Sequence, residues 1–178
     1  NDTIDGEEGE DTLSLGTPDT AIIDNAFANT RNIEILQLES GDYSTDGITL
    51  GAHAINAGLH TVDASDTTGL TLDLSEATDG LMVTGGSGDD SINATNHDDS
   101  IVGGDGDDTI DGNRGDDTLT GGDGDDVFVY TFPLVENADI ITDIDFDEDT
   151  TVADIIQISA GDDNFNLGNR DTVIDLSL

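Results

Sequence analysis

A nine-residue repeat in one fixed frame runs through residues 85–129. Read in blocks of nine from Gly85, the sequence is GGSGDDSIN, ATNHDDSIV, GGDGDDTID, GNRGDDTLT and GGDGDDVFV. Every block has Asp at its sixth place and one large apolar residue at its eighth. These are Asp90, Asp99, Asp108, Asp117 and Asp126, followed by Ile92, Ile101, Ile110, Leu119 and Phe128. A short period repeated without interruption predicts an array of stacked units.

The residue types in each block indicate how the chain folds. Glycines at the first, second and fourth places allow positive φ and a tight turn lined with backbone oxygens. The next three residues run as a short strand in which only the eighth side chain points inward. Two blocks then make one coil, and turns that are two blocks apart stack. We therefore predict an all-β fold, a right-handed parallel β-roll or β-solenoid.

Apolar burial alone does not hold such a repeat together. Ordering the residues of one block costs on the order of 9–18 kcal/mol of backbone entropy, whereas one buried Ile returns roughly 1.5–3 kcal/mol. Stacked aspartates repel one another unless a cation lies between them. Bound metal removes this repulsion and contributes to folding directly.

The charge of the whole chain also favours the binding of cations. Its 178 residues contain 42 Asp and Glu against three basic residues, for a formal net charge of −39. Such a surface repels nucleic acid and anionic lipid, and no run of apolar residues is long enough for a membrane helix. A disordered acidic tail or a halophilic surface could share this composition, but neither explains the fixed period.

Calcium is the cation that fits the donors. Carboxylates and backbone carbonyls are hard oxygen ligands, which Ca²⁺ accepts six to eight at a time, whereas Mg²⁺ demands an octahedron and retains water. His97 is the single histidine of the repeats and stands at a fourth place, so we interpret it as a degenerate turn residue and not as a zinc ligand.

The blocks resemble those of the repeats-in-toxin (RTX) family, the hemolysin-type calcium-binding repeats of exported bacterial proteins. In that family each ion lies between two turns one coil apart. The resemblance implies a first site at Gly86, Gly88, Asp90, Gly103, Asp105 and Asp108. It implies a second site at Gly104, Gly106, Asp108, Gly121, Asp123 and Asp126. A third, on the opposite edge, would use Thr95, His97, Asp99, Gly112, Arg114 and Asp117. Here turn 94–99 lacks all three glycines, and Arg114 brings a positive charge.

The remaining sequence divides around the repeats. Residues 1–14 are partial repeats in which Asp2 and Asp11 take sixth places on opposite edges, so a further coil would be needed to stack on them. Residues 15–84 predict a calcium-poor β-solenoid, with a separate small β-sandwich as the alternative; their resemblance to surface-layer and adhesin proteins is looser. Residues 130–178 resemble a C-terminal cap, and the last residues resemble a type I secretion signal.

Two possible acidic features lie within that C-terminal cap. Asp143, Asp145 and Asp147 imitate the start of an EF-hand loop, but Glu148 stands where that loop needs Gly. A looser calcium site at Asp143 or Asp145 is the alternative.

The sequence favours a structural function over catalysis. It has no cysteine, no His-Glu-x-x-His and no G-x-S-x-G nucleophile elbow. We expect a non-enzymatic, extracellular or cell-surface module that folds on calcium after secretion, as part of a surface-layer protein or adhesin that self-assembles or binds a cell-surface partner. The alternative is the C-terminal folding and secretion module of a secreted enzyme or toxin.

Overall fold

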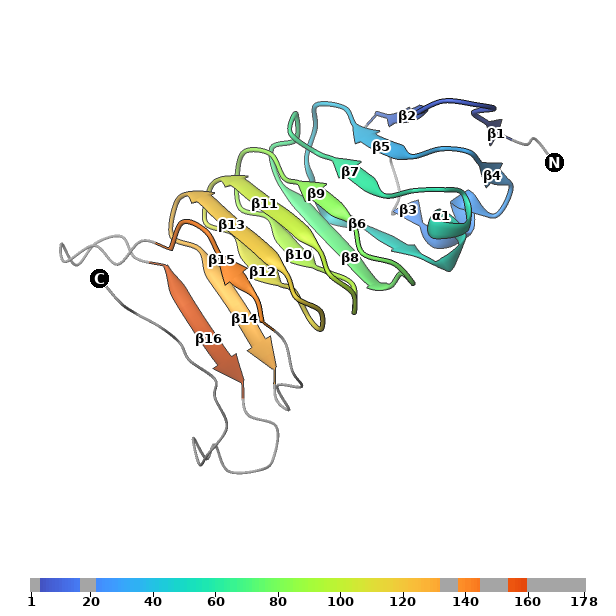
Figure 1. Ribbon diagram of the computed structural model, residues 1–178. Coiled ribbons are helices and arrows are strands. Elements are labelled where there is room, and N and C mark those ends of the chain that lie inside the picture. Colours follow the sequence, from blue (N-terminus) through green and yellow to red (C-terminus); the bar gives the residue numbers. More distant parts are fainter. Residues whose placement is uncertain (1–3, 17–21, 132–137, 145–153, 160–178) are drawn as a thin grey trace.

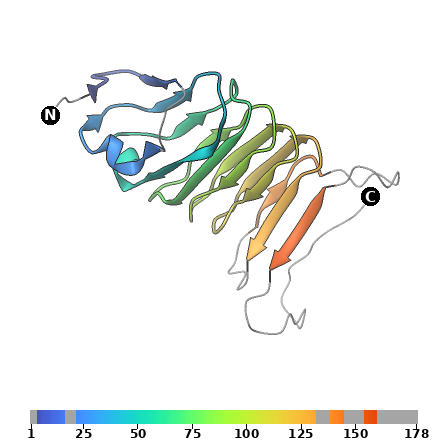
Figure 2. The same ribbon diagram turned by 180° about the vertical axis from the view of Figure 1, so that it is seen from behind.

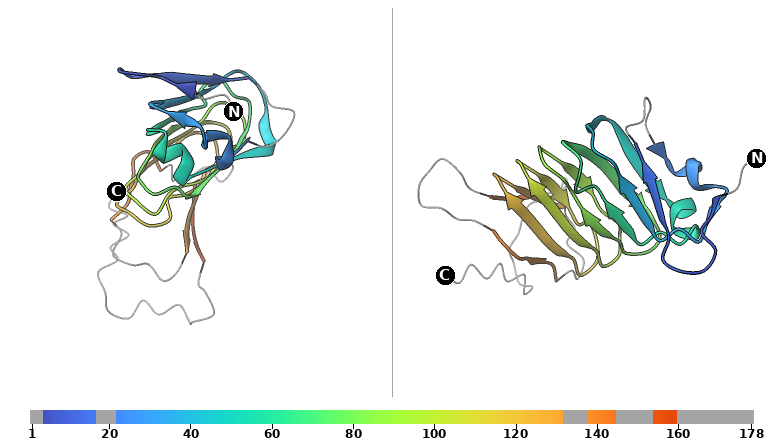
Figure 3. Two further views of the ribbon diagram at one scale, coloured as in Figure 1. Left: turned by 90° about the vertical axis from the view of Figure 1, so that its right-hand side faces the viewer. Right: turned by 90° about the horizontal axis from the view of Figure 1, so that it is seen from above.

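The computed structural model describes residues 4–16, 22–131, 138–144 and 154–159. In these residues the chain forms an elongated solenoid of parallel strands, with the coils stacked along one axis (Figure 1). The same stacking is visible from behind (Figure 2) and from above (Figure 3). The predicted all-β parallel solenoid is confirmed.

Two seven-stranded sheets form the body of the solenoid. The first sheet contains β2 (Thr12–Leu15), β5 (Ile35–Leu38), β7 (Thr61–Asp63), β9 (Met82–Thr84), β11 (Ser100–Asp105), β13 (Thr118–Asp123) and β15 (Ile140–Ile141). The second contains β3 (Ile22–Ile23), β6 (Tyr43–Gly51), β8 (Leu70–Glu76), β10 (Ser91–Asn93), β12 (Thr109–Asp111), β14 (Val127–Thr131) and β16 (Ile155–Ser159). Each coil places one strand in each sheet.

The strand register follows the period of the sequence. Ser100 pairs with Thr118 in the first sheet and Ser91 with Thr109 in the second, a shift of two blocks in both cases. Eighth-place side chains, and the apolar residues that pair with them in the flanking coils, therefore lie above one another in two inward columns. One column is Val83, Ile101, Leu119 and Ile141, and the other is Leu72, Ile92, Ile110, Phe128 and Ile156. These columns form the core of the repeat region.

The coils before the repeats are longer and more apolar. Ile35 of β5 pairs with Thr61 of β7, and Ile48 of β6 pairs with Leu72 of β8, so each of these coils exceeds two blocks. The additional residues form the 3₁₀-helix η1 (Asp24–Phe27), the α-helix α1 (Ala52–Asn56) and the pair of β1 (Ile4–Asp5) with β4 (Thr30–Arg31). No helix among the described residues is long and apolar enough to cross a membrane.

The two sheets run without a break through the predicted segment boundaries. Residues 22–84 supply strands to the same two sheets as the repeats, so they are not a separate sandwich. Beyond Val129, β15 and β16 extend both sheets by one strand each. Most of the predicted C-terminal cap, including Asp145, Asp147 and the last residues, lies outside the described residues.

Candidate calcium-binding turns

The turns of the repeats gather on two edges of the solenoid. Edge A consists of turns 85–90, 103–108 and 121–126, which lead from the first sheet to the second. Edge B consists of turns 94–99 and 112–117, which lead back. The residues of each predicted site thus come together as two turns stacked on one edge.

Turns on edge A approach one another so closely that only glycine fits at key places. Gly104 has a φ of 132°, and a Cβ there would overlap the carbonyl oxygen of Gly86. Gly122 has a φ of 121° and stands in the same relation to the carbonyl oxygen of Gly104. The carbonyl oxygens of second-place residues therefore point at the next turn, as an ion shared by two turns requires.

Backbone hydrogen bonds tie these turns together. Within the first predicted site, the Asp105 N–H donates to Gly86 O (2.9 Å) and the Gly88 N–H donates to Asp105 O (2.6 Å). In the second, the Gly106 N–H donates to Asp123 O (2.7 Å). The side chains of Asp105 and Asp123 are exposed, so at these third places only the carbonyl oxygen faces the neighbouring turn.

The sixth-place aspartates form a ladder along edge A. The Asp90 N–H donates to Asp108 Oδ1 (2.8 Å), and the Asp108 N–H donates to Asp126 Oδ1 (2.9 Å). The ladder continues beyond the repeats, because the Asp126 N–H donates to Asp154 Oδ1 (3.0 Å). Each carboxylate therefore uses one oxygen to hold the turn before it.

The other oxygen of most of these carboxylates is buried without a hydrogen-bond partner among the described residues. This holds for Asp108 Oδ2, Asp117 Oδ2 and Asp126 Oδ2, whose residues are 1% exposed. In Asp90 the corresponding Oδ2 accepts from the Gly86 N–H (3.1 Å), and Oδ1 is the oxygen without a partner. A buried, unpaired carboxylate oxygen is costly. A cation inside the turn would remove this cost, and this observation is the strongest sign of metal binding in the structure.

Burial and mutual repulsion shift the titration of these groups. Burial, aided by the charges of Asp90 and Asp126, raises the pKa of Asp108 to about 7. Burial likewise raises the pKa of Asp117 to about 7, with Asp139 and Asp99 adding to the shift. Such carboxylates are unstable as anions unless a positive charge joins them.

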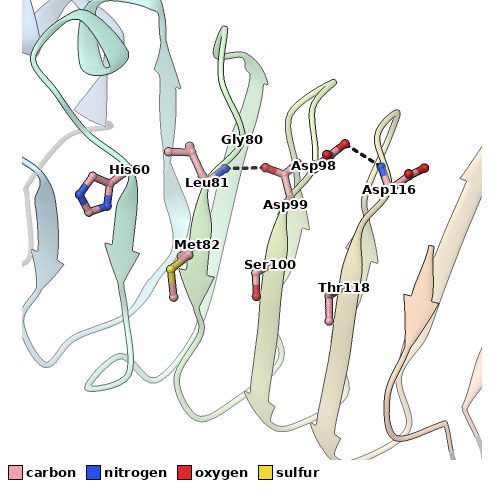
Figure 4. Close-up of a pocket in the computed structure, with 9 residues that line it drawn as sticks. All are labelled: His60, Gly80, Leu81, Met82, Asp98, Asp99, Ser100, Asp116 and Thr118. Carbon is pink, nitrogen blue, oxygen red and sulfur yellow. Dashed lines mark hydrogen bonds between the residues drawn. The ribbon is translucent and has the colours of Figure 1, made fainter. Parts of the chain in front are cut away.

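Edge B carries the same ladder with one difference. The Leu81 N–H donates to Asp99 Oδ1 and the Asp99 N–H to Asp117 Oδ1, both at 2.8 Å, and the first of these bonds is drawn in Figure 4. In turn 94–99, however, the buried Thr95 hydroxyl lies 3.1 Å and 2.9 Å from the two carboxylate oxygens of Asp99. Both oxygens of Asp99 are thereby satisfied by protein groups.

The remaining residues of the third predicted site differ in how well they match their counterparts on edge A. The Gly112 Cα lies against Asp117 Oδ2, as the first-place glycines of edge A lie against their aspartates. The side chains of His97 and Arg114 are exposed, so only their carbonyl oxygens could serve as ligands. The third site stays a prediction, and Thr95 is the residue that distinguishes it from the other two.

A second set of carboxylates runs along the outside of both edges. Fifth-place residues bond in the opposite direction to the sixth-place ladder: the Asp107 N–H donates to Asp89 Oδ1 (3.1 Å), and the Asp125 N–H donates to Asp107 Oδ1 (2.9 Å). On edge B the Asp116 N–H donates to Asp98 Oδ1 (2.9 Å; Figure 4). The fifth-place Asp thus has a structural role that the sequence analysis did not assign.

The N-terminal repeat has a stacking partner within the chain, contrary to expectation. Thr12 pairs with Ile35, which places Glu34 opposite Asp11. The Asp11 N–H donates to Glu34 Oε2 at 2.9 Å, the same contact that Asp90 makes with Asp108. Glu34 was missed because its coil has no glycine turn to mark the frame.

Asp139 and Asp154 were also missed, although the sequence carries a signal for them. Both begin the tripeptide Asp-Ile-Ile, in which the second Ile follows Asp at the interval of the sixth and eighth places. The Asp117 N–H donates to Asp139 Oδ1 (3.0 Å), so Asp139 extends edge B as Asp154 extends edge A.

The donor set fits calcium. No group of three or more His, Cys, Asp or Glu side chains is arranged to hold a metal by itself in the described part of the chain. Each predicted site instead pairs two aspartates with backbone carbonyls, an all-oxygen set that suits Ca²⁺. At the two predicted sites of edge A, Asp90 and Asp108 would hold one ion and Asp108 and Asp126 the other, and the ions would neutralise these carboxylates.

These turns, stacked on a parallel solenoid, define a calcium-binding β-roll. In agreement, residues 1–17, 82–110 and 102–129 match the family model of the RTX calcium-binding nonapeptide repeat, in four copies. In these segments the chain consists of RTX calcium-binding nonapeptide repeats. No curated protein and no solved structure matches the chain.

Proposed function

We propose that this chain is an extracellular structural module that folds when it binds calcium after secretion, and that it has no catalytic role. The buried, unpaired oxygens of Asp108 and Asp126 carry this proposal. Within residues 85–129 there are 13 aspartates and one basic residue, Arg114, which is exposed. Without a cation the repeat turns are strained by repulsion, and with calcium they become stable.

Low calcium inside a cell and high calcium outside would make folding depend on export. RTX repeats are typical of secreted proteins, which supports an extracellular location. The role we favour for the parent protein is structural or adhesive, in a surface layer or at the cell surface. A secreted enzyme or toxin that carries this chain as its folding module is the alternative.

Calcium titration of the isolated chain tests the proposal. We expect isothermal calorimetry to show several ions bound, with a gain of β-type circular dichroism in the same concentration range. Magnesium at the same concentration is the control and should not reproduce the signal. A chain that binds no calcium, or whose repeats are equally folded in a chelator, would contradict the proposed function.

The parent role needs a different measurement. Intact parent protein in millimolar calcium should form ordered assemblies or bind cells, and chelation should reverse this. Parent protein with hydrolytic or pore-forming activity that is lost on deleting this chain would favour the alternative.

A further inference from the structure

The outer face of the first sheet is uncharged from β9 to β15, although the chain as a whole has a formal net charge of −39. The outward side chains are those at the seventh and ninth places, on either side of the buried eighth-place column. They are Met82, Thr84, Ser100, Val102, Thr118, Thr120, Ile140 and Thr142. The carboxylates of the repeat turns lie to either side of this uncharged face, on edges A and B.

Three large apolar side chains are exposed on the uncharged face. Met82 is 58% exposed, Ile140 60% and Val102 37%, which makes half of the six exposed large apolar residues that the described part of the chain contains. Figure 4 shows Met82 beside Ser100 and Thr118 on neighbouring strands, where a hollow of about 440 Å³ opens. Apolar groups gathered on one uncharged face of so acidic a chain favour contact with another uncharged, partly apolar surface.

The strand register makes this face complementary to itself. Ser100 pairs with Met82 and Thr118, and Thr118 pairs with Ile140, so the four seventh-place residues form one row across β9, β11, β13 and β15. A two-fold axis in the interface, parallel to the strands and midway between β11 and β13, reverses the strand order and keeps each residue in its row. It sets Met82 over Ile140 of a second copy and Ser100 over Thr118 of that copy, and each pair occurs twice. An axis along the solenoid would instead set Met82 over Thr84, so it would not pair the apolar residues.

The same axis sets opposite charges over one another at edge B. It places turn 112–117, which leads into β13, over turn 94–99 of the second copy, which leads into β11. The first turn carries Arg114, which is exposed and forms no ion pair with any described residue, and the second carries the exposed Asp98. The single basic residue of the repeats thereby meets a carboxylate of the second copy, and this pair would help to fix the register of the contact.

We infer that the uncharged face of the first sheet binds the same face of a second copy of this chain, with Met82 against Ile140 and Arg114 beside Asp98. This contact rests on the proposed structural function and deepens it, because it names the surface through which the module self-assembles. Four strands about 4.8 Å apart and three residues long cover roughly 200 Å² of each copy, well below the about 800 Å² per partner of a stable complex. The pair is therefore weak in isolation and becomes stable where an assembly holds many copies together.

Disulfide cross-linking in calcium tests this contact, because the chain contains no cysteine of its own. A mixture of Met82→Cys chains and Ile140→Cys chains should form a disulfide-linked pair on mild oxidation. Either variant alone should cross-link at least tenfold more slowly, because the axis places two copies of the same position three strand spacings, or about 14 Å, apart, beyond the reach of a disulfide.

The second sheet offers a matched control pair. Ser91 of β10 and Ile155 of β16 are also three strand spacings apart in one outward row. A mixture of Ser91→Cys and Ile155→Cys chains should cross-link no faster than either variant alone. Circular dichroism in calcium shows that each variant is folded.

Sedimentation equilibrium in calcium gives an independent measurement. The unchanged protein should self-associate as its concentration approaches about 1 mM. Added salt should strengthen the association, because it screens the repulsion between two acidic chains. Met82→Asp should remain monomeric, since it sets a carboxylate against Ile140 of the second copy, whereas Ser91→Asp adds the same charge to the second sheet and should associate normally.

Two results would overturn this contact. One is an unchanged protein that is folded in calcium and stays monomeric at about 1 mM. The other is equal cross-linking of the two cysteine pairs. Neither result touches the proposed function, which fails instead if the repeats fold without calcium.

Discussion

Removing calcium should divide this solenoid into a folded N-terminal half and an unfolded repeat region. The two parts differ in apolar content. Residues 22–84 bury 14 large apolar side chains, whereas residues 85–129 bury five, which is about half the density along the chain. To reach the same density the repeats would need five more, worth roughly 8–15 kcal/mol.

Calcium can make up the lower end of this difference. An ion present at about 1,000 times its dissociation constant stabilises the folded state by about 4.1 kcal/mol. Two such ions between the repeat turns of edge A contribute about 8 kcal/mol. The repeats are therefore expected to be stable with calcium and unstable without it, while residues 22–84 are stable in both states.

Hydrogen exchange measured by mass spectrometry resolves the two parts. In excess chelator, peptides from β5 to β8 should remain protected, and peptides from β10 to β14 should exchange as an unfolded chain. Calcium should restore protection of the second group at least a hundredfold. Equal protection of both groups in chelator, or loss of both together, would refute the reasoning from apolar density.

Three further predictions concern single residues and pH. Asp108→Asn should weaken two calcium sites, whereas Asp90→Asn should weaken one; equal calorimetric losses would argue against a shared ligand. Because the folded pKa values of Asp108 and Asp117 are raised to about 7 from an unfolded value near 4, the calcium-free roll should be most stable below about pH 4 and lose stability as pH rises through 7. Calcium should bind more weakly as pH falls below 7, and calorimetry at pH 8 and pH 5.5 would detect this; identical affinities would contradict it. Thr95→Gly should leave Asp99 without its hydroxyl partner, destabilise the calcium-free chain by about 1–3 kcal/mol and raise the calcium count by one; an unchanged count would show that Thr95 does not replace an ion.

The regular part of the fold could be predicted from the sequence, because stacked strands are shifted by two nine-residue blocks. The period of the sequence therefore sets the strand register. Sixth-place and eighth-place residues, such as Asp108 and Ile110, occupy the columns that a coil of two blocks requires. In residues 22–84 the coils vary in length, so strand positions depend on packing and not on counting. Glu34 could be placed only through the pairing of β2 with β5.

The individual sites were less predictable than the fold. Loss of glycine in turn 94–99 indicated a weak site, but the sequence did not show that the Thr95 hydroxyl would reach both oxygens of Asp99. The interval from Asp126 to Asp154 is longer than two blocks, so the place of Asp154 depends on the pairing of β14 with β16. The period of a sequence predicts neither individual side-chain contacts nor the pairing of strands that are joined by long connections.

The identical geometry of successive two-block coils also makes the length of this module adjustable. Neighbouring strands in a sheet are about 4.8 Å apart, so each added coil would lengthen the solenoid by about that distance. An added coil could pair on both sides, as β10 pairs with β8 of the coil before it and with β12 of the coil after it. Gain or loss of whole coils, in evolution or by protein engineering, would therefore change the length of the solenoid in steps of about half a nanometre.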